Sequence, residues 1–226
     1  MKNLKSIAAG LCAALVLVGC NVSNTAKGTA IGAGGSAAVG AIIGKIAGNT
    51  AVGAAIGGVV GAGTGAIIGS KMDRAKKQAE AVKNAQVETI TDANGLEAVK
   101  VTFDSGILFA TNKADLNAES KASLQQFATV LKDNSECDIA IFGHTDNTGT
   151  DAINNPLSKK RAQSVSSYLK TQGVASSQIK TVDGQGSTNP VADNGTAEGR
   201  KQNRRVEVYM YASEKMIKEA NAEAAK

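Results

Sequence analysis

Residues 143–161 read GHTDNTGTDAINNPLSKKR and connect an apolar run to a segment with helical periodicity. The apolar run before this stretch, Ile139–Phe142, is typical of a buried strand. Polar and small residues follow, and apolar residues then return at helical spacing. The stretch therefore predicts a strand, a loop and a helix. The loop lies at the carboxyl end of the strand, where open α/β sheets usually bind their ligands.

Arg161 is the most informative residue of the predicted helix. Leu157, Val165 and Leu169 lie at four-residue steps on one face, and Arg161 belongs to the same stripe. A guanidinium among core-facing positions is costly unless it is paired, so we expect an anionic group to meet it. Asp146, in the preceding loop, is the nearest candidate. An Asp and an Arg at one junction can bind the ammonium and the carboxylate of an amino acid head group.

The same residues form part of a longer pattern, T-D-x-x-G-x-x-x-x-N-x-x-L-S-x-x-R-A. It is read at Thr145, Asp146, Gly149, Asn154, Leu157, Ser158, Arg161 and Ala162. Further matches follow at Gly184–Gly186, Asn189–Val191, Glu198–Arg200 and Asn203–Val206. Together these motifs resemble the peptidoglycan-binding signature of the OmpA C-terminal domain family. The resemblance covers residues 99–211, about half of the chain.

The resemblance implies a fold and a ligand. The fold is of the α/β (α+β) class, a mixed β-sheet with helices packed on it, over residues 99–212. In that family the residues matching Asp146 and Arg161 hold the diaminopimelate of peptidoglycan. The resemblance implies that Asp146 binds the ammonium of diaminopimelate and that Arg161 binds its carboxylate. Asn154 and Thr148 join the expected ligand-binding set, and Arg204 would add a contact to the carboxylates. A structural Asp-Arg ion pair and a solvated basic rim at Arg204 are the alternatives.

The first residues have the features of a processing signal. A basic start at Lys2 and Lys5 precedes an apolar core that is too short for a permanent membrane helix. The core ends in Leu17–Cys20, which resembles the bacterial lipobox. This implies a signal peptide over residues 1–19 and lipidation of Cys20, with a short linker to residue 27. Asn21 in place of Asp favours the outer membrane. A conventional signal peptide with a chance cysteine is the alternative.

Residues 28–70 have a different composition. Small residues recur at every fourth position, at Gly28, Gly32, Ser36, Gly40, Gly44 and Gly48, and, after a slip of one residue, at Gly53, Gly57, Gly61, Gly65 and Gly69. The pattern resembles the glycine zippers of bacterial envelope proteins, in which helices approach closely in lipid. A membrane-associated or self-associating helical hairpin is one interpretation. A flexible Gly/Ala tether is the other.

The remaining segments are assigned from composition and period. Residues 71–86 are predicted to form a polar helical connector, and residues 87–98 to start a hairpin that turns at Asn94–Gly95. Further predictions are a helix from about Asn117, a helix stop at Gly173, strands at Ile179–Val182 and Val206–Tyr211, a short helix within Thr196–Arg205, and a loose solvent helix over residues 213–226. The second of these strands alternates as a half-buried edge or antiparallel strand would.

Several function classes are disfavoured. The single histidine, His144, provides neither a nucleophile nor a metal set, so we expect no catalysis, no metal and no cofactor. The net charge of +5 and an aromatic content of 3% give no support for nucleic acid binding. Cys137 has no disulfide partner in the processed chain.

Two noncatalytic hypotheses remain. In the first, an outer-membrane lipoprotein binds peptidoglycan noncovalently and tethers the membrane to the cell wall. In the second, residues 28–69 insert into the membrane or oligomerise, and the OmpA-like domain only localises the protein.

Overall fold

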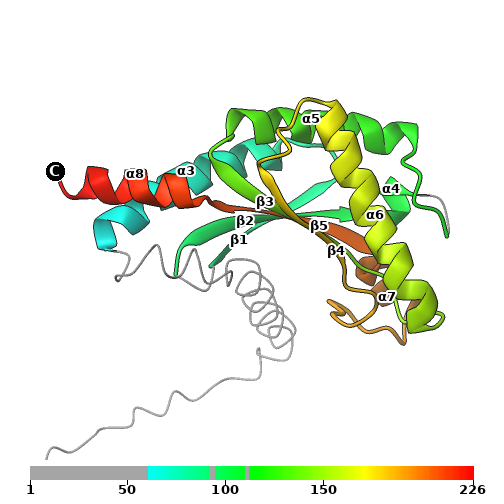
Figure 1. Cartoon of the computed structure of the whole chain (residues 1–226). Helices are drawn as coiled ribbons and strands as arrows, with labels where there is room; N and C mark the ends of the chain where they lie inside the picture. The colour runs from blue at the N-terminus through cyan, green and yellow to red at the C-terminus, as the bar shows by residue number, and fades with distance from the viewer. Residues whose placement is uncertain (1–60, 92–94, 110–111) are drawn as a thin grey trace, which may run out of the picture.

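The structure, a computed structural model, describes residues 61–91, 95–109 and 112–226 (Figure 1). The predicted signal peptide, Cys20 and most of the glycine-rich segment lie outside these ranges, so the expectations for them stay predictions. Among the helices within these ranges, none combines the length and the apolar character that crossing a bilayer requires.

A five-stranded mixed sheet forms the centre of the fold, in the order β1-β2-β5-β3-β4. The strands are β1 (Ala85–Thr91), β2 (Glu97–Asp104), β3 (Cys137–Gly143), β4 (Ile179–Gly184) and β5 (Arg205–Ala212). β5 is antiparallel to both β2 and β3, whereas β3 and β4 are parallel. The predicted mixed sheet is confirmed. β5 is antiparallel as predicted, but it is neither an edge strand nor half-buried, because both of its faces are covered.

Helices cover one face of this sheet, which we call the first face. They are α3 (Ala62–Glu80), α4 (Ser105–Leu108), α5 (Ala118–Asp133), α6 (Asp151–Thr171) and α8 (Glu214–Ala224), and α7 (Ala197–Asn203) precedes β5. Their apolar side chains meet those of the strands in one buried cluster, which includes Met72, Val101, Phe127, Val165, Val208 and Met216. This core fixes the strand ends and the helix positions on which the site depends.

The helix ends follow the local signals in the sequence. Asn117 caps α5, since its side chain accepts a hydrogen bond from the Ser120 amide at 2.8 Å. Gly173 follows α6 with a φ of 90°, a conformation that glycine adopts without strain. Both predicted boundaries are confirmed.

The ends of the described chain differ from expectation. α3 crosses the predicted boundary at residues 70–71 and buries Ile68, Met72 and Ala75 in the core. α8 is not a loose tail: it packs on α3, and the Thr64 hydroxyl donates to Asn221 Oδ1 at 2.7 Å. This contact was not predictable, because it joins segments 157 residues apart. Both helices belong to the same packed unit as the sheet (Figure 1).

The opposite side of the sheet, the second face, has its own small apolar cluster. Phe142 and Tyr209 meet edge to face there, with ring centroids 5.9 Å apart. Ala98, Ala140 and Tyr211 complete the cluster. Strand alternation places the charged side chains of Arg205 and Glu207 on this face as well.

Candidate functional site

The site forms where β3 ends and β5 begins. These strand ends are adjacent, and the His144 amide donates to the Arg205 carbonyl at 2.9 Å. α6 approaches the same place closely, because a Cβ atom at Gly143 would collide with the Ser158 carbonyl oxygen. The connection between α4 and α5 supplies a third segment, and α4 before it begins at Ser105, whose amide donates to the Arg204 carbonyl. Segments far apart in the sequence therefore converge at one end of the central strands.

Asp146 lies in the loop after β3 and is 7% exposed. Its Oδ1 accepts a hydrogen bond from the Thr148 amide at 2.8 Å, and its carbonyl accepts one from Asn154 Nδ2 at 3.3 Å. Of the predicted ligand-binding set, Thr148 thus orients the Asp146 carboxylate, and Asn154 holds the backbone of Asp146. Asn154 is itself buried in the first turn of α6.

Arg204 is the ion-pair partner of Asp146. Its Nη1 lies 2.5 Å from Asp146 Oδ2, although the Arg204 side chain remains 37% exposed. Burial alone would raise the pKa of Asp146, but the hydrogen bonds from Arg204 and Thr148 outweigh it and hold the pKa below its usual value. Asp146 is therefore a carboxylate at neutral pH.

Arg161 is buried, as the helical stripe predicts, with 4% exposed. Its Nε donates to the Lys113 carbonyl at 3.1 Å, and its guanidinium carbon lies 5.2 Å from the centroid of the Phe109 ring. Burial lowers the pKa of Arg161, the nearby charge of Arg204 lowers it further, and Asp146 opposes both. The expected anionic contact with Asp146 is not formed, because Asp146 pairs with Arg204 instead.

The structure thus brings together all five predicted ligand-binding residues, with different roles. Asp146 offers an acceptor, and Arg161 and Arg204 offer donors. Thr148 orients the carboxylate of Asp146, and Asn154 holds its backbone. Sequence reasoning missed Phe109 and the Lys113 carbonyl, which fix Arg161 from a segment 48 residues away. An ammonium and a carboxylate on one ligand would complement this set of charges. Within the described ranges, no cluster of three His, Cys, Asp or Glu residues could hold a metal ion.

His144 does not take part in this arrangement. It is 1% exposed, and its Nε2 lies 3.2 Å from Glu207 Oε2. Burial lowers the pKa of His144, so the ring is neutral at pH 7. Cys137 is buried as well, and burial raises the pKa of its thiol to about 12, which makes the thiol unreactive.

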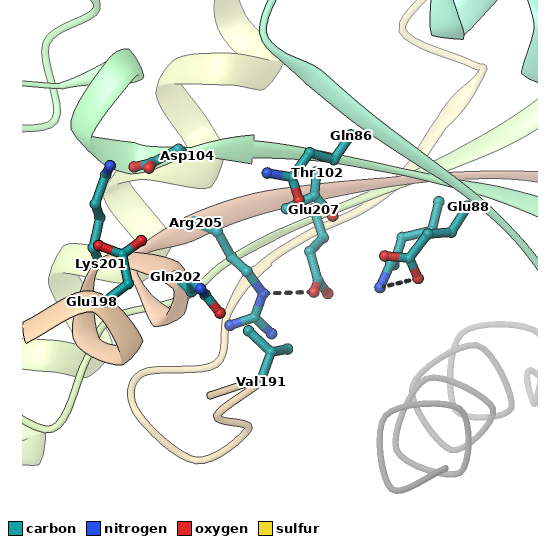
Figure 2. A pocket seen from close by; sticks show the side chains of 11 residues that line it. Gln86, Glu88, Thr102, Asp104, Val191, Glu198, Lys201, Gln202, Arg205 and Glu207 are labelled. Atoms are coloured by element: carbon teal, nitrogen blue, oxygen red, sulfur yellow. Dashed lines mark hydrogen bonds and ion pairs between the residues drawn. The ribbon is translucent and has the colours of Figure 1, made fainter. Parts of the chain in front are cut away.

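A polar cavity lies on the second face of the sheet, apart from the site at Asp146 (Figure 2). It has a volume of about 380 Å³ and is lined by Gln86, Glu88, Lys100, Thr102, Asp104, Val191, Glu198, Lys201, Gln202, Arg205 and Glu207. Its buried charges are paired internally: Arg205 Nε lies 2.7 Å from Glu207 Oε1, and Lys100 Nζ lies 2.9 Å from Glu88 Oε2. No predicted ligand-binding residue lines it.

Residues 108–204 match the model of the OmpA family, and residues 1–73 match that of the YMGG-like Gly-zipper. The C-terminal unit is an OmpA-like domain. The resemblance seen in the motifs is confirmed for both segments, and the site described above lies within or at the edge of the OmpA match.

Known proteins are similar to this domain. The probable lipoprotein YiaD of Escherichia coli is 45% identical over 108 residues, which cover 48% of this chain and 46% of YiaD. The peptidoglycan-binding protein ArfA of Mycobacterium tuberculosis is 43% identical over 111 residues, or 49% of this chain and 34% of ArfA. The solved cell wall anchor of the T6SS from Pseudomonas aeruginosa superposes with a TM-score of 0.52 at 29% identity, covering 63% of this chain and 97% of that one. The chain thus spans about half or less of these two curated relatives.

Proposed function

We propose that the OmpA-like domain binds peptidoglycan noncovalently through diaminopimelate. Asp146 takes the ammonium of the ligand, and Arg161 and Arg204 take its carboxylates. The observation that carries this proposal is the convergence of one buried carboxylate and two guanidinium groups at one end of the central strands. The name of the peptidoglycan-binding protein ArfA and the cell wall anchor of similar fold support peptidoglycan as the polymer that is bound.

The tethering role extends this proposal to the whole chain. Acyl chains on Cys20 would hold the protein in the outer membrane, while the domain in the periplasm grips the cell wall. Each contact can be weak, because confinement beside a dense polymer raises the effective concentration of the ligand. The role requires no catalysis. The name of the relative YiaD, a probable lipoprotein, supports the anchor.

Sedimentation with purified diaminopimelate-type sacculi tests the ligand. The protein would lack residues 1–19 and carry Cys20→Ser, to remain unlipidated. We expect Asp146→Ala and Arg161→Ala to abolish cosedimentation. Asp73→Ala and Arg74→Ala remove the same charges from exposed positions on α3 and should bind like the parent. Equal binding by all variants, or no binding by the parent, contradicts the proposal.

The match of residues 1–73 to the YMGG-like Gly-zipper favours a second candidate, membrane insertion or self-association through residues 28–69. Removal of residues 28–60 tests it and spares α3, whose Ile68 and Met72 belong to the core. If tethering is the function, the shortened protein keeps its binding to sacculi and its envelope role. Loss of the envelope role with intact sacculus binding supports the zipper.

A further inference from the structure

We infer that Arg204 makes the site select ligands that carry an ammonium and a carboxylate together, by occupying Asp146 until such a ligand arrives. This inference rests on the proposed function, since it concerns the same site. It assigns Arg204 a role as an internal competitor of the ligand, beyond that of a carboxylate contact.

The first support is that the acceptor of the site is already engaged. Asp146 Oδ1 accepts from the Thr148 amide, and Oδ2 accepts from Arg204 Nη1 at 2.5 Å. The Arg204 guanidinium thus lies where an ammonium of the ligand would bind. An incoming cation must displace it or share the oxygen, and sharing places two cations against each other.

The second support is that the two arginines differ in how firmly they are held. Arg161 is buried, donates to the Lys113 carbonyl and lies over the Phe109 ring. The Arg204 side chain is 37% exposed, and its ion pair with Asp146 is the single side-chain contact described for it. A partly exposed ion pair of this kind contributes little net stability, so displacement of Arg204 is inexpensive.

The third support is the charge left behind by each class of ligand. A plain amine that takes Asp146 releases Arg204 without a partner beside Arg161, whose pKa the Arg204 charge already lowers. A ligand with only carboxylates leaves the ion pair of Asp146 and Arg204 in place. Its own carboxylate then lies near the carboxylate of Asp146, and the two negative charges repel each other. A zwitterionic head group replaces both halves of the pair, because its ammonium takes Asp146 while its carboxylate joins Arg204 and Arg161.

Three small probes separate these cases: meso-diaminopimelate, 1,5-diaminopentane, which lacks the carboxylates, and pimelate, which lacks the amines. We expect the parent to bind meso-diaminopimelate most tightly, and the other two probes weakly. Arg204→Gln removes the competitor, so 1,5-diaminopentane should bind this variant about five times more tightly than it binds the parent. The ratio of the affinities for diaminopimelate and for 1,5-diaminopentane should therefore fall. Lys201→Gln removes an exposed charge from the same helix, α7, and should behave as the parent.

Titration of Asp146 by NMR provides a second measurement that needs no ligand. Loss of Arg204 removes a hydrogen bond that lowers the pKa of Asp146, so that pKa should rise in Arg204→Gln and stay unchanged in Lys201→Gln. Binding of 1,5-diaminopentane that is absent, unchanged or weaker in Arg204→Gln overturns the inference, even if the parent binds sacculi. Failure of the parent to bind diaminopimelate and sacculi overturns the proposed function instead, whatever the diamine does.

Discussion

Arg204 and Arg205 are neighbours in the sequence, yet their surroundings are opposite. The Arg204 side chain is 37% exposed and pairs with Asp146 at the candidate site. The Arg205 side chain is 4% exposed and makes three hydrogen bonds on the second face, to Glu207 and to the carbonyls of Asn203 and Asn189. A ligand can therefore replace either partner of the Arg204–Asp146 pair, whereas the Arg205–Glu207 pair is buried and structural.

This difference shows why a charged pair alone does not mark a binding site. Glu207 is surrounded by Arg205, His144 and Tyr209, and these groups hold its pKa well below the usual range in spite of its burial. Such a network is expensive to disrupt, because removal of one member leaves a buried charge uncompensated. Asp146 has fewer partners, and its arginine partner is partly exposed, which suits a reversible contact.

The largest effect expected from the comparison of Arg204 with Arg205 is on the free energy of unfolding. Glu207→Ala leaves the buried Arg205 without its countercharge, so we expect the free energy of unfolding to fall by about 3–5 kcal/mol. Urea denaturation measures this, with Glu219→Ala as a control at a carboxylate that is 57% exposed and pairs with the exposed Lys215. A loss below about 1 kcal/mol would mean that the network on the second face is not structural.

Arg161 lies between the two cases, since it is buried but its charge faces the site. Arg161→Lys keeps the charge and loses the planar fork, so we expect diaminopimelate to bind about tenfold more weakly, or about 1.4 kcal/mol. Calorimetric titration of the parent and the variant gives this ratio. Unchanged affinity would show that the ligand needs only a positive charge there.

Arg204→Ala should have a smaller effect, now on stability. Because its ion pair with Asp146 is partly exposed, the free energy of unfolding should fall by about 1 kcal/mol or less. The same urea series measures it beside Glu207→Ala. A cost equal to that of Glu207→Ala would remove the distinction between the two arginines.

The smallest effect is the pH dependence of Asp146. Its pKa in the folded protein is lowered, so its contribution to stability is present above its ordinary value of 3.8 and is lost as the pH falls through the folded pKa. The stability difference between the parent and Asp146→Asn should therefore stay constant from pH 7 to about pH 4 and shrink below that. Denaturation at a series of pH values checks it, and a difference that grows on acidification contradicts the sign.

Much of the fold was readable from the sequence because its signals are local. The cap at Asn117, the stop at Gly173 and the stripe that contains Arg161 each depend on a few neighbouring residues. The central position of β5 and the packing of α8 on α3 were not readable in this way. They depend on contacts between distant segments, and composition alone made the residues after 212 look solvated.

The candidate site follows the same division. The sequence motifs predicted Asp146, Arg161, Asn154, Thr148 and Arg204 as members of one set, and the structure places them together. Which arginine pairs with Asp146 was not predictable, because Arg204 lies 58 residues away and reaches it only through the pairing of β3 with β5. The contact of Arg161 with the Lys113 carbonyl was not predictable either, because any residue type supplies a backbone carbonyl.

The most direct test of the central claim is an NMR titration of the described domain, within the unlipidated protein, with meso-diaminopimelate. The account predicts saturable shifts in the Asp146 and Thr148 amides and in the side-chain Nε signals of Arg161 and Arg204, while Arg205 Nε stays unchanged. Shifts confined to Arg205 and its neighbours in the cavity on the second face, or no shifts at all, would contradict the assignment of the ligand to the site at Asp146.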